Sequence, residues 1–510
     1  MNTSQIMDVI RDMERRFAVD QWTVDGVALW PFLRVRLNFD LFRAHQLHQP
    51  AVSLAVRALS VARNAVRFCY ASLADVRRNR LRAGRADVVF LSDGLSFALL
   101  NGVWYEKYCD PLIERFRERG LSSLLVSPGH AYHIPRHTPS LFIQPRLDAV
   151  MVRRTLHVPR MAVSDTFNRE YPEYARRLGE LDLNVQALAP DAVCRYAAII
   201  RDIAKLYRGI LSRAGARLAF IVCYYSVEGM AFTLACRELG IPSVELQHGG
   251  GIEGDLHVAY AAWTKVPQDG YALLPSHFWC WTGNDVEVIR RWNATVAGLH
   301  QPVLGGNPWL NEWRAGRSAV VSEYDQRIAA AQGAAADKRQ LLVTLQYGLA
   351  DDRALGPLLG AIRRTQHEWR WWVRLHPVML NERDAVRSLL TRHGIVEYDL
   401  DAASDLPLYA LLRRMDLHLT HSSATVIEAS EFGIPSVIVS EYGREFFPGQ
   451  IAAGRAQAAY ETDDIIAACR SLLDVRDRRD RDPSPPVDAG PALDLLLSQA
   501  ASQKQERTAS

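Results

Sequence analysis

Short apolar runs alternate with amphipathic helical stretches along most of the chain after residue 85. Each run is rich in β-branched or aromatic residues and ends in a polar or glycine-containing turn, a pattern typical of buried parallel strands. The first series covers 86–94, 122–129, 217–226, 241–251, 277–283 and 302–308, with helical stretches at 191–214 and 228–239. The second covers 340–348, 369–377, 394–399, 415–423 and 434–440. Strands separated by helices predict βαβ units and therefore two parallel sheets.

The predicted fold class is α/β, with two Rossmann-like domains and an N-terminal helical extension. We place the basic helical extension at 1–84, the first domain at 85–308 and the second at 309–475. Residues 476–510 are charged and Pro-rich, so we expect them to form a mobile tail.

The segment 51–82 predicts a basic amphipathic helix. Between 51 and 86 there are eight arginines and a single acid, Asp75. Such a helix can lie on an anionic membrane, or it can pack on the next domain with its arginines in water. The two faces on a helical wheel are Ser53, Arg57, Ser60, Arg63, Asn64 and Arg67 against Leu54, Val61, Ala65 and Phe68.

Composition narrows the class of protein. The 510 residues carry a net charge of only +3, which does not indicate a nucleic-acid partner. The seven cysteines are scattered without a C-x-x-C pair, so neither a zinc site nor a disulfide framework is predicted. The N-terminus lacks the apolar region of a signal peptide, and no apolar run approaches ~18 residues. We expect a cytoplasmic protein, or one peripheral at the inner face of the cytoplasmic membrane.

Polar residues follow two strands of the second series, at the point where each strand ends. Ser422, Ser423 and Thr425 follow one strand and begin a helix, where hydroxyls and free backbone N–H groups can bind an anion or simply cap the helix. Arg374 and His376 end another strand, and Pro377 fixes the histidine at its tip. Ligands of doubly wound sheets bind beyond such strand ends.

The first series offers candidates for a general base. His248 ends a strand and precedes three glycines, which leave room for a substrate beside it. Asp93 and Glu228 follow two other strands of the series. A structural turn histidine, an Asx turn and a helix cap are the competing interpretations of these three residues.

Two common nucleotide motifs are missing from the chain. The fingerprint G-x-G-x-x-G does not follow the first strand, and no Walker A sequence occurs. A nicotinamide dehydrogenase and a P-loop NTPase are therefore disfavoured.

The chain resembles glycosyltransferases of the GT-B fold. The segment Gly305-Gly306-Asn307-Pro308 resembles their domain crossover, and Glu428 begins a sequence similar to their E-A-x-x-x-G-x-P segment. His376-Pro377 and Ser422-Ser423 resemble the HP and S-S/T motifs of bacterial sialyltransferases and Kdo transferases, and also elements of CDP-glycerol glycerophosphotransferases. The resemblance covers about 87–475, and the two-acid base motif of sialyltransferases is only half matched.

The resemblance implies a donor site and a reaction. Transfer would proceed from a nucleotide sugar, with CMP-linked Kdo or sialic acid favoured, to a surface polysaccharide or lipid-linked acceptor in capsule or lipopolysaccharide synthesis. His248 is the preferred base, with Asp93 and Glu228 as alternatives. No cofactor or metal is implied. The residues that would bind the nucleotide are Arg374, His376, Ser422, Ser423, Thr425 and Glu428 (for the ribose), with Gln346 and Gly348.

Three other activities remain open at this point. A polyol-phosphate transferase would use a CDP-linked donor and attack phosphorus. A sugar-nucleotide epimerase would use the same nucleotide site, and a non-catalytic member would be a scaffold. The density of polar strand ends argues against the scaffold.

Overall fold

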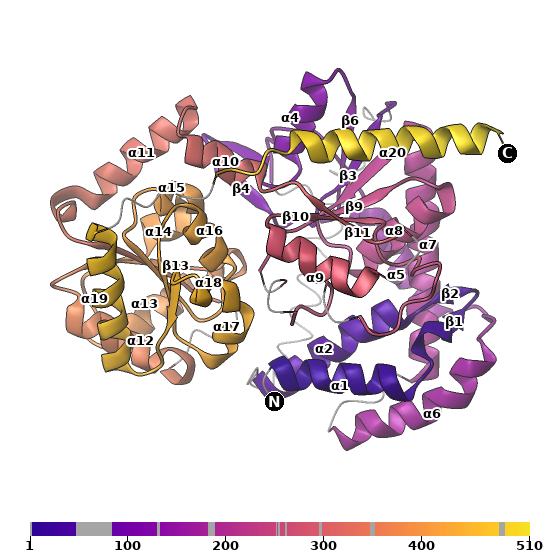
Figure 1. Cartoon of the computed structure of the whole chain (residues 1–510), viewed down its shortest axis with the longest axis horizontal. Helices are drawn as coiled ribbons and strands as arrows, with labels where there is room; N and C mark the ends of the chain where they lie inside the picture. Colours follow the sequence, from indigo (N-terminus) through magenta and orange to yellow (C-terminus); the bar gives the residue numbers. More distant parts are fainter. Residues whose placement is uncertain are drawn as a thin grey trace.

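The computed structural model of the chain describes residues 3–46, 84–129, 133–181, 189–250, 252, 255–260, 263–294, 298–346, 352–478 and 485–509. The basic segment 51–82 and Gly348 therefore lie outside the described residues. Figure 1 shows two α/β halves, with the second half in orange and the first in purple to pink.

The first half is built on a seven-stranded parallel sheet with the order β11-β10-β9-β8-β3-β6-β7. The chain starts in the middle at β3, moves outward to β7, then returns to β8 and continues to β11. The winding therefore reverses between β3 and β8, as in a doubly wound fold. The strands are β3 (Val88–Leu91), β6 (Ser123–Ser127), β7 (Ser140–Phe142), β8 (Leu218–Ile221), β9 (Ser243–Leu246), β10 (His277–Cys280) and β11 (Gln301–Leu304).

The second half repeats this design in a six-stranded parallel sheet with the order β14-β13-β12-β15-β16-β17. Here the winding reverses between β12 and β15. The strands are β12 (Gln340–Thr344), β13 (Arg370–Arg374), β14 (Tyr398–Asp399), β15 (Leu417–Thr420), β16 (Ser436–Ile438) and β17 (Ala456–Ala458). The two sheets confirm the predicted fold class of two Rossmann-like domains.

Helices fill the connections in both halves. Those up to the crossover are α1 (Thr3–Arg16), α2 (Trp30–Gln46), α4 (Asp110–Glu118), α5 (Gln144–Leu156), α6 (Asp165–Glu180), α7 (Pro190–Ala214), α8 (Val227–Leu239) and α9 (Gly283–Asn293). Those after it are α10 (Pro308–Ala315), α11 (Ala319–Gln332), α12 (Asp352–Thr365), α13 (Arg383–Arg392), α14 (Asp401–Asp405), α15 (Leu408–Leu412), α16 (Thr425–Glu431), α17 (Glu441–Phe446), α18 (Pro448–Ala452), α19 (Thr462–Arg478) and α20 (Gly490–Ala509). Short 3-10 turns cover Val19–Gln21, Gly333–Ala335 and Pro377–Glu382 (η4).

The first sheet buries both of its faces because side chains alternate along each strand. In β3, Val89 and Leu91 join a core shared with α7 and α8, whereas Val88 and Phe90 face α4 and α20. Continuous burial of this kind explains why the strands are apolar throughout rather than alternating with polar residues.

The N-terminal helices α1 and α2 share the first of these two cores with the sheet. Glu14 and Arg34 form an ion pair that is fully buried between them, 3.0 Å from Oε1 to Nε. Glu14 Oε2 also accepts a hydrogen bond from the backbone N–H of Thr264, so the helices hold the loop that follows β9.

Helix α20 corrects one sequence expectation. We predicted a mobile tail over 476–510, but Gly490–Ala509 forms a helix that returns to the first half (Figure 1). Leu493 and Leu496 are fully buried there, in one core with Phe220 and Trp279. The apolar positions within this polar segment bury area that offsets the entropy of ordering it.

Several short strands were not predicted. The pair β4 (Phe97–Leu100) and β5 (Val103–Glu106) forms a hairpin after β3, and β1 (Thr23–Val24) pairs with β2 (Val27–Ala28). The strands β7 and β17 lie at sheet edges. Each has three residues and no β-branched apolar run, so periodicity carried no signal for them.

Candidate functional site

His248 lies just beyond β9, at the carboxyl edge of the first sheet. Its Nδ1 is 3.1 Å from the carbonyl oxygen of Leu246, which can only accept, so Nδ1 carries the proton. Nε2 therefore accepts from the hydroxyl of Tyr225 at 2.9 Å, and the two rings stack. Burial lowers the pKa of His248, while the charge of Asp93 acts in the opposite direction. The imidazole is neutral at pH 7, as a general base must be.

The two alternative carboxylates occupy different surroundings. Asp93 follows β3 and accepts hydrogen bonds from the backbone N–H groups of Leu95 and Ser96 at 2.8 and 2.9 Å, so it forms the turn that leads into β4. Glu228 lies in the first turn of α8, where its charge adds to the effect of burial in raising the pKa of Tyr207 on α7. Asp93 is thus near His248, but its carboxylate has a local structural role.

On the second sheet, the polar residues after β12 and β15 form one hydrogen-bonded network. The amide of Gln346 donates to Thr420 Oγ1 at 3.1 Å and accepts from the backbone N–H of Ser422 at 3.3 Å. Ser423 Oγ lies 2.9 Å from Thr425 Oγ1 and accepts from the Thr425 N–H. These residues lie where the winding of the second sheet reverses, the usual ligand position in such sheets.

Arg374 and His376 end β13 beside this network. Arg374 Nη1 donates to the carbonyls of Ala403 and Leu406, at 2.5 and 2.6 Å, and burial lowers its pKa to about 10. Nδ1 of His376 accepts from the backbone N–H of Val378 at 3.4 Å, so Nε2 carries the proton of the neutral ring. Desolvation, then the charges of Lys107 and Arg374, lower the His376 pKa.

Glu428 connects the second half to the crossover. Its Oε1 accepts from the hydroxyl of Tyr409 at 2.5 Å, and that hydroxyl accepts from Asn307 Nδ2 at 3.1 Å. Asn307 also caps α10 through Leu310 N–H. Burial raises the pKa of Glu428, and Tyr409 and Lys107 counter this shift. The Gly-Asn-Pro segment therefore has a structural function in joining the halves.

The strand ends of the two halves lie close together. A Cβ on Gly250, two residues after His248, would lie 2.9 Å from the Phe447 ring and 3.3 Å from Ile427. Burial raises the pKa of Tyr108 of the first half, and Glu428 is near enough for its charge to add to this shift. The same Cβ would lie 3.4 Å from Cα of Ala424, so the segments that carry His248 and the Ser422 network meet at one junction.

Sequence reasoning missed three residues at this junction: Lys107, Tyr108 and Tyr225. Tyr108 donates from Oη to the His248 carbonyl at 3.2 Å, and its ring stacks against Trp281. Tyr225 follows β8, so its strand-end position was a usable signal. Lys107 and Tyr108 follow β5, and without the β4–β5 hairpin no sequence pattern placed them near His248.

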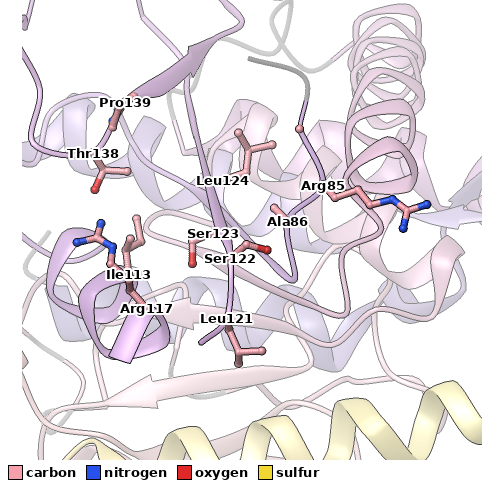
Figure 2. Close-up of a pocket in the computed structure, with 11 residues that line it drawn as sticks. Arg85, Ala86, Ile113, Arg117, Leu121, Ser122, Ser123, Leu124, Thr138 and Pro139 are labelled. Atoms are coloured by element: carbon pink, nitrogen blue, oxygen red, sulfur yellow. The ribbon is translucent and has the colours of Figure 1, made fainter. Parts of the chain in front are cut away.

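A separate cavity opens at the opposite edge of the first sheet (Figure 2). Its volume is about 560 Å³, and its lining includes Arg85, Arg117, Ser123 and Thr138. Ser123 begins β6, so this cavity lies at the amino ends of the strands. Ligands of doubly wound sheets bind at the carboxyl ends, and we do not assign the donor here.

The described part of the chain lacks both a cluster of metal-ligating side chains and a membrane-spanning helix. No group of three or more His, Cys, Asp or Glu side chains there could hold a metal ion. None of the helices there has both the length and the apolar character that crossing a membrane requires.

No protein-family model and no curated protein matches the chain. Among solved structures, it is similar to the UDP-GlcNAc 2-epimerase from Neisseria meningitidis, with 12% identity, coverage of 81% of this chain and 99% of that chain, and a TM-score of 0.49. It is also similar to a variant of the wall teichoic acid polymerase TagF, with 10% identity, coverage of 85% of this chain and 98% of that chain, and a TM-score of 0.46. For the spinosyn rhamnosyltransferase SpnG the identity is 15%, the coverage is 82% of this chain and 98% of that chain, and the TM-score is 0.38.

Proposed function

We propose that the chain is a glycosyltransferase that moves a sugar from a nucleotide-sugar donor to an acceptor hydroxyl. The observation that carries this proposal is the juxtaposition of two polar strand-end clusters. The His248 cluster belongs to one doubly wound sheet, the Ser422 cluster to the other, and they meet at Gly250. Two such sheets facing each other provide separate places for donor and acceptor.

The donor nucleotide binds in the second half. Its phosphate lies near His376, Ser422 and Ser423, and its ribose lies near Glu428. The neutral His376 can donate from Nε2, and the two serine hydroxyls can donate as well. Helix α16 has only seven residues, so these side chains carry more of the binding than the helix dipole does.

The acceptor binds in the first half beside His248. The acceptor oxygen forms a bond to the anomeric carbon, while the bond from that carbon to the phosphate oxygen breaks and leaves its electron pair on the phosphate. The acceptor proton passes to Nε2 of His248, where the acceptor hydroxyl takes the place of Tyr225. Protein groups stabilise the departing phosphate, a task that a divalent metal has in other enzymes.

The proposed identity of the donor rests on the resemblance of His376-Pro377 and Ser422-Ser423 to the HP and S-S/T motifs of bacterial sialyltransferases and Kdo transferases. It favours a CMP-linked donor such as Kdo or sialic acid, and a growing surface polysaccharide or a lipid-linked oligosaccharide as the acceptor. Work on such an acceptor would take place at the inner face of the cytoplasmic membrane. The domain division at 308/309 belongs to the same proposal, with acceptor and donor on opposite sides of it.

A panel of CMP-, CDP- and UDP-linked sugars tests the class of reaction. Transfer requires a supplied acceptor, such as an oligosaccharide, and releases the nucleotide. Conversion of the sugar nucleotide without an acceptor would identify an epimerase, and a product that retains the donor phosphate would identify a polyol-phosphate transferase. A protein that neither binds nor converts any member of the panel would contradict the proposal.

His376→Ala tests the donor site directly. The variant loses one hydrogen-bond donor to the phosphate, so we expect nucleotide binding to weaken by roughly 1–3 kcal/mol. Calorimetric titration with CMP, CDP and UDP measures the loss. The exposed His367, which pairs with Glu397 at 2.6 Å, is the matched control, and His367→Ala should bind as the wild type does. Equal affinities for both variants would rule out this donor site.

A further inference from the structure

We propose that Lys107, from the first half, supplies the positive charge that binds and stabilises the leaving phosphate of the donor held by the second half. The inference rests on the proposed nucleotide site and adds a residue to it. It also makes the donor site composite, because the first half contributes a charge to a phosphate that the second half holds.

The backbone around Lys107 is held firmly in place. Its own N–H donates to the Ser96 carbonyl at 3.0 Å. The carboxyl group of the buried Glu106 accepts from Tyr108 N–H at 3.0 Å and from Cys109 N–H. Asp110 accepts from Glu106 N–H at 2.7 Å. The connection between β5 and α4 thus has a fixed path, which suits a residue that must present a charge at a defined point.

The side chain of Lys107 lies at the junction of the halves. Nζ is 5.5 Å from the centroid of the Tyr108 ring, and Tyr108 in turn donates to the His248 carbonyl. Burial is the main cause of the lowered pKa of His248 and His376 and of the raised pKa of Glu428. The lysine charge adds to the first two shifts and opposes the third, so it acts on groups of both halves. These three residues belong to the clusters assigned above to the acceptor and the donor.

The ammonium is available for an anion. It is half-buried, and among the residues that the structure describes no carboxylate lies within salt-bridge distance of Nζ. An ammonium has three N–H donors and no acceptor, so a phosphate oxygen is a suitable partner. Charge-assisted hydrogen bonds of this kind are roughly twice as strong as neutral ones.

Arg374 is the one cation that the proposed donor site takes from the second half. Burial keeps His376 neutral, the serines are neutral, and Arg374 directs Nη1 to two backbone carbonyls. The leaving phosphate gains negative charge as the bond to the anomeric carbon breaks. A cation placed beforehand at that position lowers the barrier, because it favours the transition state more than the ground state.

Calorimetric titrations of the full-length protein test the inference. The probes are CMP, CDP and UDP, with cytidine and uridine as uncharged counterparts. The variants are Lys107→Met, which keeps the length of the side chain, and Lys107→Arg, which keeps the charge. Lys338→Met is the matched control, because Lys338 pairs with Glu397 before β12, at the amino edge of the second sheet.

We expect Lys107→Met to bind the nucleotides about ten- to hundredfold more weakly, with nucleoside affinity unchanged. Lys107→Arg should retain most of the nucleotide affinity, and Lys338→Met all of it. The salt dependence of nucleotide binding should also be smaller in Lys107→Met, since one charge contact is lost.

The outcomes separate the inference from the proposed function. If the wild type binds no nucleotide, the proposed function itself is wrong. If the wild type binds and Lys107→Met binds equally well, the donor site stands and the role of Lys107 is overturned. An equal loss of nucleoside and nucleotide binding would indicate a structural role for Lys107, which also overturns the inference.

Discussion

Burial sets the protonation state of the two histidines that matter most at the junction. Both His248 and His376 have a pKa below the ordinary value of 6.5, mainly because the protein excludes water from the charged ring. A neutral His248 can accept a proton, and a neutral His376 can still donate a hydrogen bond from Nε2. The same physical effect therefore prepares one ring as a base and the other as a donor.

His248→Ala should reduce turnover by about 10²–10⁴-fold, because the base is removed. Nucleotide affinity and melting temperature should stay near the wild-type values, since the donor is held by the other half. In the wild type, kcat/KM should fall only below pH 6.5, where His248 becomes protonated, given its lowered pKa. Steady-state rates across pH with the donor identified by the panel measure both effects.

Asp93→Asn and Glu228→Gln complete this comparison. Glu228→Gln should leave the rate nearly unchanged, because Glu228 acts on Tyr207 and lies in the first turn of α8. Asp93→Asn also changes the turn at Leu95 and Ser96, which the carboxylate holds, so a lower rate in this variant has two possible causes. If His248→Ala keeps near-full turnover and either carboxylate variant loses it, the general base is that carboxylate and not His248.

At the scale of elements, strand periodicity predicted the central strands of both sheets and the edge strands β11 and β14, but missed the edge strands β7 and β17. Central strands such as β3 and β12 are buried along their whole length, so they need continuous apolar runs. The edge strand β17 has the sequence Ala-Gln-Ala and pairs on one side only. Helix α20 was missed for a different reason, because its polar and Pro-rich surroundings resemble a disordered tail.

Leu493→Ala tests the packing of α20. Leu493 is fully buried against the first sheet, so we expect a loss of about 2–5 kcal/mol in the free energy of unfolding. Leu495 lies on the same helix with 48% of its surface exposed, and Leu495→Ala should stay within about 0.5 kcal/mol of the wild type. Denaturant melts measure both. Equal stability of the two variants would restore the mobile tail that the sequence predicted.

At the scale of the whole molecule, several contacts join the halves. The hairpin turn at Asn101 donates to Glu323 Oε2 of α11 at 2.6 Å, and Ser4 of α1 donates to Glu445 Oε2 of α17 at 3.3 Å. The chain also crosses at Gly305, where a Cβ would overlap the Trp279 ring, and returns through α20. The junction is therefore held by separate segments on more than one side of the site.

The whole molecule should lose stability as the pH falls from 6.5 to 5. Burial lowers the pKa of five histidines to between about 3 and 4, so below 6.5 the unfolded chain binds protons that the folded chain does not. Each fully buried histidine contributes up to about 2 kcal/mol over this range. Carboxyl groups whose pKa burial raises oppose the effect, and the expected decline is the net of the two sets of groups. These carboxyl groups are Glu106, Asp110, Glu245, Asp285, Glu312, Glu428 and Glu431. The five are His257, His277, His300, His418 and His421.

Urea unfolding at pH 7, 6 and 5 measures this dependence. His418→Gln should show a shallower decline, because this ring is buried between Thr344 and Ser436 and would no longer titrate. Stability that is constant or rises on acidification would mean that the carboxyl groups dominate.

The sequence by itself determined the two series of central strands, the helices between them and the polar residues at the strand ends. Those features depend on neighbours along the chain: apolar runs, turns and caps, all readable over a few residues. Only the tertiary structure decided which strand ends meet. It brought Lys107 beside His248, seated α20 on the first sheet, and engaged Asp93 in a turn and Arg374 with backbone carbonyls. Such contacts join segments far apart in the chain, and no local pattern encodes them.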